Sequence, residues 1–560
     1  MTLWQKVVNG MRLEAETITG AAILIAGFGL ASRVLGLVRD RILAGMFGAS
    51  GLDVYYAAFQ VPDLLYSLLV VGAISTAFIP VFAGYFERDK GEAWRVASGV
   101  FSLFAVVFSA LAVIAIFFAP YFMRFVVPGF SPERRAVAVD LTRIMFLSPV
   151  FFGLANVLAS ALQYFRRFFM VSAAPLVYNL GIIFGALVLT PVLGPAGLAW
   201  GVVVGAISFF ALHLVGVAGL NFRFLDFSSM FHVGVRTIIA QALPRTVGLA
   251  LGQIVQVVVA VMASAFAAGS IGVYNLALNL QGVPIGLVGV AFASAAFPKL
   301  SRAWAEGNIV KFRTTLSHTL REILFFLVPL AALLVILRAQ IVRVFYGFGK
   351  FGWVDTRLTA AALGLFAISI VAQGVIPLLV RAFYSRHKTA VPVGIGIAAV
   401  ALTVVLAGAL VPVFSGSNFL AILLRVQDLA DTRVLALVLA FSLASFFNAT
   451  LLYLFAAREM RDGFHREVVP AFAKMFVAAG ALALATYGGL RVLAAVVNMQ
   501  STVGVFTQGV GAAAMGLTAY VVVAYLFGCR EMMILAPVVR RLAFWREFVP
   551  AAIREEEDLR

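Results

Sequence analysis

Long apolar segments recur along this chain between residues 21 and 528, each about 20 to 30 residues long. A helix needs about 20 apolar residues to cross the hydrocarbon core of a bilayer. The segments lack the strict alternation of polar and apolar residues that is typical of outer-membrane β-strands. The sequence therefore predicts an all-α polytopic protein of a cytoplasmic-type membrane.

We predict about 14 transmembrane helices. Their expected bounds are 21–46, 54–85, 96–127, 137–165, 172–191, 196–220, 238–266, 271–300, 316–346, 357–384, 390–413, 433–457, 470–495 and 503–528. An even number of spans places both termini on one side. Residues 1–20 are then a cytoplasmic N-terminal segment and residues 529–560 a cytoplasmic C-terminal tail. We also expect a short interfacial helix near residues 419–426, within a long outer loop.

The composition excludes a soluble globular protein, because 63% of the residues are hydrophobic and only 12% are charged. A net charge of +17 would favour nucleic acid as a partner of a soluble protein. Here the basic residues lie at span ends, and two thirds of the 42 Lys and Arg residues fall near the side that carries the termini. This is the positive-inside pattern, with anionic membrane lipids as the partners of these charges. We expect no nucleic acid partner.

The chain offers little for metal or redox chemistry. Cys529 is its one cysteine, and its five histidines are scattered without ligand spacing. We expect no metal and no cofactor. Residues 1–20 contain Glu14 and Glu16, and no small-residue cleavage site follows a short apolar core, so we expect no cleavable signal peptide.

Residues 32–80 carry charges at predicted membrane depth, where charges are expensive and mark sites or pathways. On the first span, small and charged residues share one helical stripe: Ala22, Ala26, Gly29, Arg33, Gly36 and Asp40. One interpretation is a charge pair, Arg33 with Asp40, that ties helices together. The other is a cavity wall that receives an anion.

The sequence also contains an internal echo. Residues 54–62 and 72–82 resemble residues 273–284 and 290–300, at an offset of about 218 residues. Six spans separate the copies, which predicts two pseudo-symmetric six-helix lobes, 21–220 and 221–457, around a central cavity. Two further helices, within 458–528, lie outside the repeat.

Three groups of motifs give the chain a family resemblance. The run SRVLGLVRDRILAGMFGAS at 32–50, with GLDVYYAAFQVPDLL and GAISTAFIPVF after it, resembles the N-terminal signature of the MurJ (MviN) lipid II flippases. These belong to the multidrug/oligosaccharidyl-lipid/polysaccharide exporter superfamily. YGFGKFGWVDT at 346–356 and RAFYSRHKTAVPV at 381–393 agree with it. The resemblance implies alternating access that carries undecaprenyl-diphosphate-linked peptidoglycan precursor, lipid II, to the outer leaflet of the bacterial cytoplasmic (inner) membrane. It also allows cell-wall synthesis proteins as partners.

The resemblance implies a substrate-binding set in the cavity. Family arginines fall on Arg33 and Arg39, whose guanidinium groups can bond a diphosphate bidentately. Asp53 matches a family position and is expected to anchor an arginine or to cap the second span. The full predicted set is Arg33, Arg39, Asp40, Asp53, Gln60, Asp63, Tyr66 and Asn279.

This sequence departs from the family pattern at three charged positions. Tyr66 replaces a basic residue, Val71 an acidic residue, and Asn279 an arginine. Tyr66 and Asn279 can still donate hydrogen bonds, but without charge assistance each contributes about half as much. These departures leave the head group of the lipid-linked substrate open.

Other functions remain as alternatives. They are a flippase for another polyprenyl-diphosphate-linked glycan, a cation-coupled drug exporter, and a non-transporting lipid-binding relative. The predicted spans of the second lobe contain no Asp or Glu at mid-membrane depth, which disfavours a coupling ion there, although Asp40 and Asp63 keep coupling possible in the first lobe. A polytopic glycosyltransferase would need catalytic carboxylates in sizeable loops, so we predict a transporter and not an enzyme.

Overall fold

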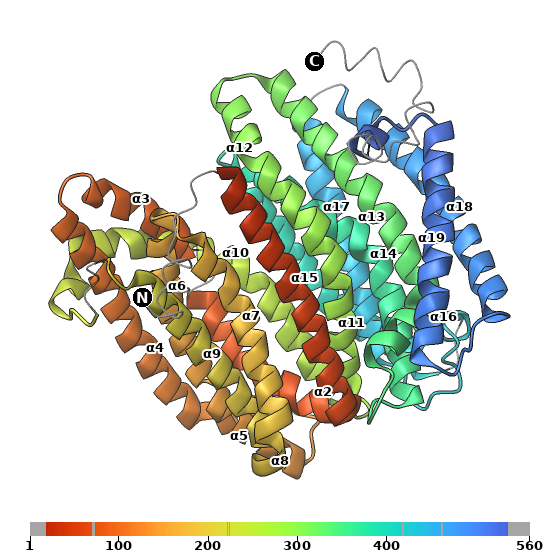
Figure 1. The fold of residues 1–560 in the computed structure, drawn as a ribbon, viewed down its shortest axis with the longest axis horizontal. Coiled ribbons are helices and arrows are strands. Elements are labelled where there is room, and N and C mark those ends of the chain that lie inside the picture. The colour runs from red at the N-terminus through yellow and green to blue at the C-terminus, as the bar shows by residue number, and fades with distance from the viewer. Residues whose placement is uncertain are drawn as a thin grey trace, which may run out of the picture. The chain divides into compact units, whose positions relative to one another are not determined.

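The structure is a computed structural model that describes residues 18–69, 73–220, 222, 224–416, 419–460 and 463–535. Every regular element in this part of the chain is a helix (Figure 1). The expectation of an all-α protein is therefore confirmed. Packing divides the chain into two compact units.

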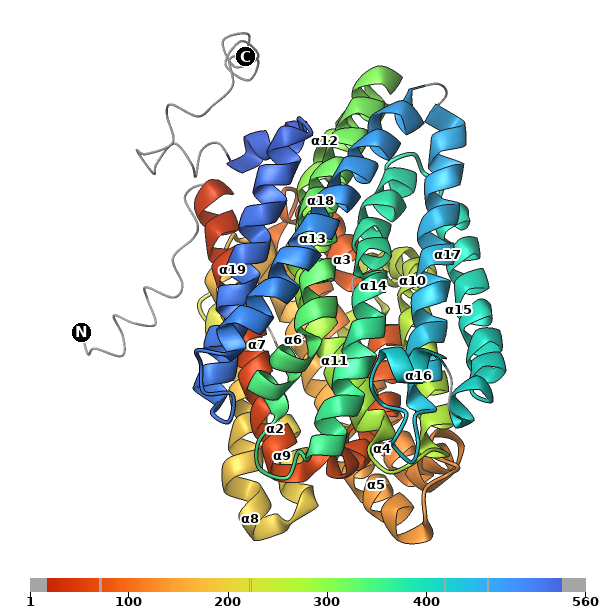
Figure 2. The same cartoon turned by 90° about the vertical axis from the view of Figure 1, so that its right-hand side faces the viewer.

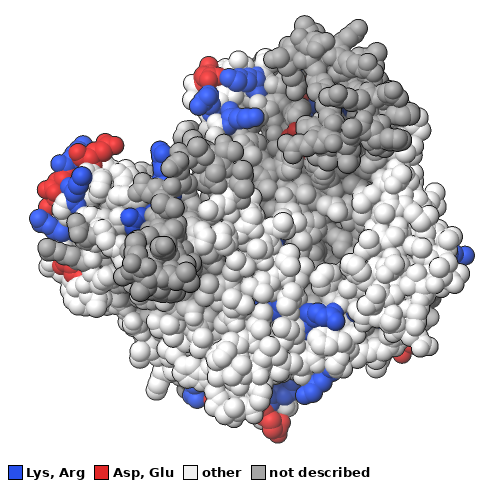
Figure 3. Space-filling model, viewed as in Figure 1, with Lys and Arg blue, Asp and Glu red and all other residues white. Residues whose placement is uncertain are grey.

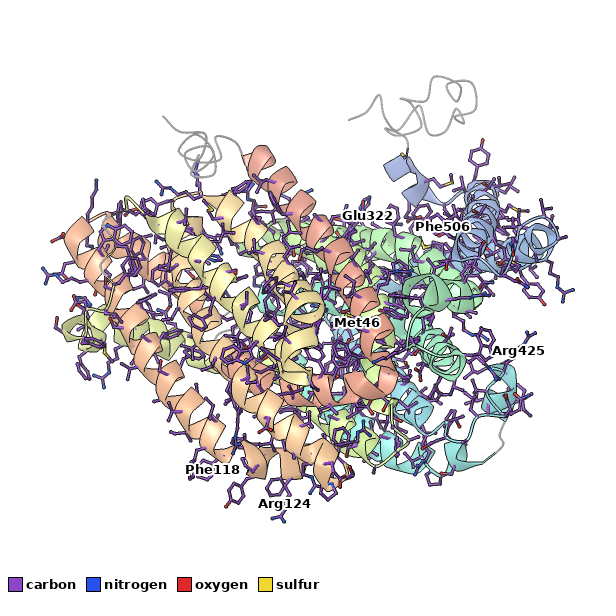
Figure 4. The ribbon with its side chains drawn as sticks, turned by 60° about the horizontal axis from the view of Figure 1, so that its bottom comes forward. Met46, Phe118, Arg124, Glu322, Arg425 and Phe506 are labelled. Carbon is purple, nitrogen blue, oxygen red and sulfur yellow. The ribbon has the colours of Figure 1, made fainter. Side chains whose placement is uncertain are left out.

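The first unit takes the described residues up to Leu280, together with Phe345–Ala362 and Val400–Ala440. It begins with α2 (Ile18–Leu69), which continues through Gly48, where φ is 65°. This backbone value is not helical and suits glycine, so α2 is two helices joined at a kink. Figure 4 labels Met46 close to that bend. The elements that follow α2 in this unit are α3 (Ala73–Phe86), α4 (Lys90–Val126), α5 (Pro132–Met145), α6 (Leu147–Tyr164), α7 (Phe168–Phe184), η1 (Gly185–Leu189), α8 (Thr190–Leu193), α9 (Pro195–Val217), η2 (Ser228–Phe231), α10 (Val233–Ser264) and most of α11 (Ser270–Pro284).

The first unit also holds the long loop segment around residues 413–423. It contains η4 (Val413–Ser415) and α16 (Phe419–Leu423), and α16 confirms the short helix expected near residues 419–426. Phe419, Ile422 and Leu423 of α16 are largely exposed.

The second unit takes Gln281–Val344, Leu363–Ala399 and the described residues from Phe441 onward. Its elements are η3 (Ile285–Val290), α12 (Ala291–Ala305), α13 (Ile309–Tyr346), most of α14 (Trp353–Tyr384), part of α15 (Ala390–Leu410), most of α17 (Val434–Met460), α18 (Phe464–Ala494), α19 (Thr502–Leu526) and η5 (Arg530–Leu535). In Figures 1 and 2, α18 and α19 run side by side as a pair. The expected lobes 21–220 and 221–457 remain a prediction.

Twelve helices among the described residues are long and apolar enough to cross a membrane. One of them, Leu24–Ser67, contains the Gly48 kink. Two further apolar helices among the described residues, Ala77–Phe86 and Leu251–Ser264, are shorter than these twelve. A polytopic helical protein is thus confirmed, and the figure of fourteen spans stays a prediction. Several helices begin five to seven residues before the predicted spans, as α4 and α13 do. The apolar window marks only the part in lipid, while the helix continues into a polar turn.

Local sequence signals explain the ends of several helices. The Asp89 carboxylate accepts from the amides of Gly91 and Glu92 at the start of α4. Ser131 caps α5, whose first residue is Pro132, and Ser501 caps α19. The Asp and Ser side chains accept from amides that lack a partner in the first turn, and proline at the first helical position has no N–H to satisfy.

Glycines bring α7 and α9 into close contact within the first unit. A Cβ added to Gly181 would lie 2.3 Å from the Cα of Gly205, and one added to Gly185 would lie 2.3 Å from the Cα of Gly201. Small residues four positions apart let membrane helices approach closely without a hydrophobic driving force. Figure 1 shows the two helices adjacent.

The surface agrees with a membrane location. In Figure 3 the Lys, Arg, Asp and Glu side chains gather mostly near helix ends, and the surface along the helices is almost free of charge. Figure 4 shows Phe118 and Arg124 of α4 pointing away from the ribbon. Phe118 is 43% exposed. Apolar side chains of this kind face lipid in a membrane protein.

Candidate functional site

The candidate site is centred on Arg39 and Asp40, in the half of α2 that precedes the kink. Nε and Nη2 of Arg39 donate to one oxygen of Asp40, at 2.9 and 2.7 Å. Nη1 of Arg39 donates to the side-chain oxygen of Asn179 on α7, at 2.9 Å. Asp40 is buried, at 2% exposure, whereas the Arg39 side chain is 21% exposed. The carboxylate and the amide therefore fix the direction of the guanidinium.

Asn279 of α11 completes this group. Its Nδ2 donates to the second oxygen of Asp40, at 2.9 Å. Three of the predicted residues, Arg39, Asp40 and Asn279, are thus brought together, although 239 positions separate Asp40 from Asn279. We call Arg39, Asp40, Asn179 and Asn279 the Arg39 cluster.

Tyrosines surround the Arg39 cluster. Tyr55, Tyr56 and Tyr346 lie close enough to interact electrostatically with both Arg39 and Asp40, and Tyr178 interacts with Arg39. The Tyr346 hydroxyl donates to the carbonyl of Leu276, at 3.3 Å. The buried Tyr56 hydroxyl has no hydrogen-bond partner among the described residues. The surroundings therefore offer a further hydroxyl donor to a polar group.

Arg33 lies on the same helix but not in the Arg39 cluster. Seven residues separate it from Asp40, which is about 10 Å along a helix axis. Both oxygens of Asp40 are bonded by Arg39 and Asn279 instead. The interpretation of an Arg33–Asp40 charge pair is therefore wrong, because Asp40 pairs with its own neighbour in sequence.

Gln60, Asp63 and Tyr66 lie beyond the kink of α2. The Gln60 side chain donates to the carbonyl of Tyr56, at 3.3 Å, and is 7% exposed. The Tyr66 hydroxyl accepts from Nδ2 of Asn156 on α6, at 2.9 Å. The Asp63 side chain is partly exposed, and none of the described residues donates to its carboxylate. Gln60 is thus occupied within its own helix, and Asp63 keeps its acceptors.

Asp53 lies apart, at the start of the second half of α2. Its carboxylate accepts from the amides of Gly269 and Gly272, at 2.6 and 2.8 Å, and from Nη2 of Arg134, at 2.9 Å. Asp53 therefore anchors an arginine, as one of the two alternatives predicted. The cap falls on the start of α11, however, and not on the second span. Asp53 stabilises a helix junction rather than contacting the Arg39 cluster.

Glycine is required at the Asp53 junction. Gly269 has φ of 102°, which L side chains rarely adopt. A Cβ on Gly272 would lie 2.4 Å from the carbonyl oxygen of Ala49. The short segment before α11 thus presents bare amides to the carboxylate.

Sequence reasoning missed three partners: Asn179, Asn156 and Arg134. A signal was present for the two asparagines, because each is an amide within a predicted apolar span. Such a residue is expensive in lipid unless it has a polar partner. Arg134 lies in the polar first turn of α5, before the predicted span at 137–165, and gave no such signal.

The cluster has the donors that an oxyanion requires. A guanidinium has five N–H groups, and the bonds of Arg39 to Asp40 and Asn179 use three. No acceptor in the described part of the chain takes the other two, so they remain for a phosphate or carboxylate. Among the described residues, no three His, Cys, Asp or Glu side chains come together as metal ligands would.

The fold and this site define a class: a multi-pass helical membrane protein with the fold of the MurJ and MATE proteins. A solved structure titled "Lipid II flippase MurJ, inward closed conformation" matches with a TM-score of 0.71 at 21% identity, covering 92% of this chain and all of that one. A multidrug resistance MATE transporter of the MOP superfamily in an inward-facing conformation matches with a TM-score of 0.64 at 13% identity, covering 77% of this chain and 94% of that one. At these identities, the likeness shows the fold alone.

The family itself follows from the sequence comparisons. The family model described as "Lipid II flippase MurJ" matches residues 43–507, so the chain belongs to the MurJ family. "Lipid II flippase MurJ" of Burkholderia cenocepacia is 29% identical over 397 residues, which are 68% of this chain and 76% of that protein. "Probable lipid II flippase MurJ" of Bdellovibrio bacteriovorus is 26% identical over 550 residues, 94% of this chain and 97% of that one. The predicted recognition is confirmed, and the chain is a transporter by family rather than an enzyme.

Proposed function

We propose that this chain moves lipid II, the undecaprenyl-diphosphate-linked peptidoglycan precursor, from the cytoplasmic to the outer leaflet of the bacterial inner membrane by alternating access. Membership of the MurJ family supports the substrate class. The observation that carries the proposal is the Arg39 cluster, in which a guanidinium within a membrane-spanning helix is held by Asp40 and Asn179 and retains two N–H groups.

Asp40 neutralises the charge of Arg39 within the membrane-spanning helix. An unpaired cation at membrane depth is strongly unfavourable, and the adjacent carboxylate offsets that charge while substrate is absent. A diphosphate carries more negative charge than one carboxylate and can accept hydrogen bonds from the two free N–H groups of Arg39. Binding through these N–H groups then replaces part of the solvation of the head group, while the bonds of Arg39 to Asp40 remain in place.

Arg33 extends this proposal along the first span. It lies about two turns from Asp40 and is partly exposed. We place the diphosphate between Arg33 and Arg39, with Tyr66, Gln60 and Asp63 toward the saccharide or peptide part. Asn279 contributes indirectly, because its amide bonds Asp40.

A second candidate is a flippase for another polyprenyl-diphosphate-linked glycan. The observation that favours it is the pair Tyr66 and Asn279, which are neutral at positions where the family resemblance implies charge. Tyr66 is bonded to Asn156 and Asn279 to Asp40. The polyprenyl diphosphate would be the same, and only the contacts to the head group would differ.

We further propose that both termini lie in the cytoplasm, as the distribution of Lys and Arg indicates. The two six-helix lobes, 21–220 and 221–457, would move relative to each other around the substrate. Cell-wall synthesis proteins are the partners that such a flippase would serve.

Complementation of a strain depleted of its own lipid II flippase tests the proposal. The wild-type chain should restore growth, and Arg33→Ala or Arg39→Ala should abolish rescue while membrane insertion stays intact. Arg124→Ala is the matched control, since Arg124 is exposed at the end of α4 and points away from the ribbon (Figure 4). Full rescue by both Arg33→Ala and Arg39→Ala would refute the assignment of the diphosphate site. Failure of the wild-type chain, although it is inserted, would favour the other glycan.

A further inference from the structure

A small cavity in the second unit lies beside the C-terminal ends of α12, α14 and α17. It has a volume of about 240 Å³ and is lined by residues from the α12–α13 corner, the α14–α15 turn and the end of α17. The lining residues are Trp304, Ile309, Phe312, Arg386, Lys388, Glu459 and Met460. None of them belongs to the Arg39 cluster, and Arg386 and Lys388 come from the family-like motif at 381–393.

The α14–α15 turn holds the two cations of the cavity in place. The amide of Lys388 donates to the carbonyl of Phe383, at 3.1 Å, and His387 adopts a left-handed backbone, with φ of 59°. This is the closing pattern of a helix C-terminus. Nε of Arg386 also donates to the carbonyl of Ala382, at 3.1 Å. The turn therefore fixes both side chains relative to the end of α14.

Arg386 is a buried cation in an aromatic setting. Its side chain is 2% exposed, and its guanidinium carbon lies 4.8 Å from the ring centre of Phe383, 5.6 Å from Phe312 and 5.8 Å from Trp304. Nη1 pairs with the Glu459 carboxylate. Nη2 is buried and has no hydrogen-bond partner in the described part of the chain. An unmet guanidinium donor of this kind favours a nearby anion.

The charges of the cavity do not balance. Glu459 is shared by Arg386 and Lys388, whose Nζ lies 2.9 Å from its second oxygen. Two cations thus face one carboxylate, and the Lys388 side chain is 48% exposed. The local net charge is positive, and Lys388 is accessible to a ligand from outside.

The surroundings are those of a membrane interface. Membrane-spanning helices end here at Ala305, Tyr384 and Met460, and another begins at Ile309. Ile309 and Val310 are 57% and 63% exposed, and Trp304 is 36% exposed. Tryptophan with exposed aliphatic side chains at a helix end is typical of the boundary between head groups and acyl chains.

We propose that this cavity binds the phosphodiester head group of an anionic phospholipid, with the acyl chains lying along Ile309 and Val310. Basic pockets between membrane helices are suited to such head groups. The cavity is smaller than the range usual for drug-sized ligands, which fits a phosphate group and not a saccharide-peptide head group. The apolar rim distinguishes a lipid from a free anion. This site is separate from the proposed transport site.

The test uses the full-length purified protein in neutral detergent, titrated with short-chain phosphatidylglycerol, phosphatidylcholine or inorganic phosphate and followed by calorimetry. Phosphatidylglycerol should bind more tightly than phosphatidylcholine. Lys388→Gln should weaken its binding about fivefold, the effect of one basic residue near an anionic head group. Glu459→Gln should act in the opposite direction and strengthen binding, because it removes the competing carboxylate.

The matched control is Lys299→Gln, which removes one exposed positive charge from α12 without touching the cavity lining. It should leave the affinity within twofold of wild type. An equal loss in Lys299→Gln and Lys388→Gln would overturn the proposal, because it would indicate unspecific surface charge. Equal binding of the two phospholipids would overturn the phosphate-charge assignment, and inorganic phosphate binding as tightly as phosphatidylglycerol would overturn the lipid assignment. Thermal unfolding without lipid checks that each variant is folded.

Discussion

Replacing Asp53 with alanine should open the start of α11 locally. The carboxylate is 2% exposed and accepts from two buried amides and one guanidinium. Removing one member of a buried charged pair typically costs about 3–5 kcal/mol, and each buried amide left without an acceptor is part of that penalty. The free energy that protects the amides of Gly269 and Gly272 should therefore fall by about 3–5 kcal/mol.

Hydrogen–deuterium exchange measures this change directly. A loss of about 3–5 kcal/mol corresponds to exchange about 150- to 5,000-fold faster in peptides that cover residues 267–275. Asp53→Asn, which keeps one acceptor oxygen, should give a smaller increase. Asp140→Ala is the control, since Asp140 is 69% exposed and its partner among the described residues is Arg143 on its own helix. Exchange that stays slow in Asp53→Ala, or rises equally in the control, would refute this account of the junction.

Three further predictions concern Asn279, the loop residues Asp428 and Asp431, and the membrane potential. Asn279→Arg places a second guanidinium beside Asp40 and should tighten the binding of a soluble polyprenyl-diphosphate analogue about fivefold. Asn279→Ala should not tighten it, and equal affinities of the two variants would contradict the charge argument. Hydrogen bonds from Arg357 lower the pKa of Asp428. Burial raises the pKa of Asp431, but hydrogen bonds from Arg433 lower it overall. These contacts therefore stabilise the loop between α15 and α17 above the ordinary carboxyl pKa and are lost as pH falls through the lowered values. The anisotropy of a fluorophore on Leu423→Cys should drop only in acid, and a flat profile would contradict this. An inside-negative membrane potential favours outward movement of a multiply anionic lipid by about 2.3 kcal/mol per charge per 100 mV. Collapsing the potential with valinomycin and K⁺ at constant pH should therefore stop flipping. Flipping that persists and needs a sodium gradient would instead implicate Asp40 and Asp63 as ion ligands.

Much of the helical fold could be predicted from hydropathy, because lipid requires every backbone group to be bonded within a helix. The bounds were less predictable. Helices α4 and α13 begin in polar turns that hydropathy does not register, and the predicted span 54–85 falls on the end of α2 and on α3, with residues 70–72 outside the described part. The kink at Gly48 depends on one positive φ angle within a continuous helical pattern.

The candidate site was predictable as a set of residues but not as a geometry. Arg39 and Asp40 stood out because charge in an apolar span is costly, whereas Asn279 was noticed only through the family resemblance. That Asn279 bonds Asp40, and that Asp53 caps α11 rather than its own helix, depends on contacts over more than 200 residues. Hydropathy and local spacing carry no information about contacts between residues so far apart in the sequence. The cavity around Arg386 and Lys388 could not be predicted for the same reason, because residues from three separate turns line it.

The π-helical segment η3 has a consequence for how chains of this family can vary in length. It joins α11 to α12 immediately after Pro284, and Gly289 within it is so close to Gly374 that an added Cβ would lie 2.5 Å from the Gly374 carbonyl. A π turn accommodates one residue more than an α turn. Deleting that residue would rotate all of α12 by about 100° and move its buried face toward lipid. We therefore expect one-residue insertions and deletions to be excluded from 285–305 among functional relatives, while the exposed corner at 306–308 tolerates them.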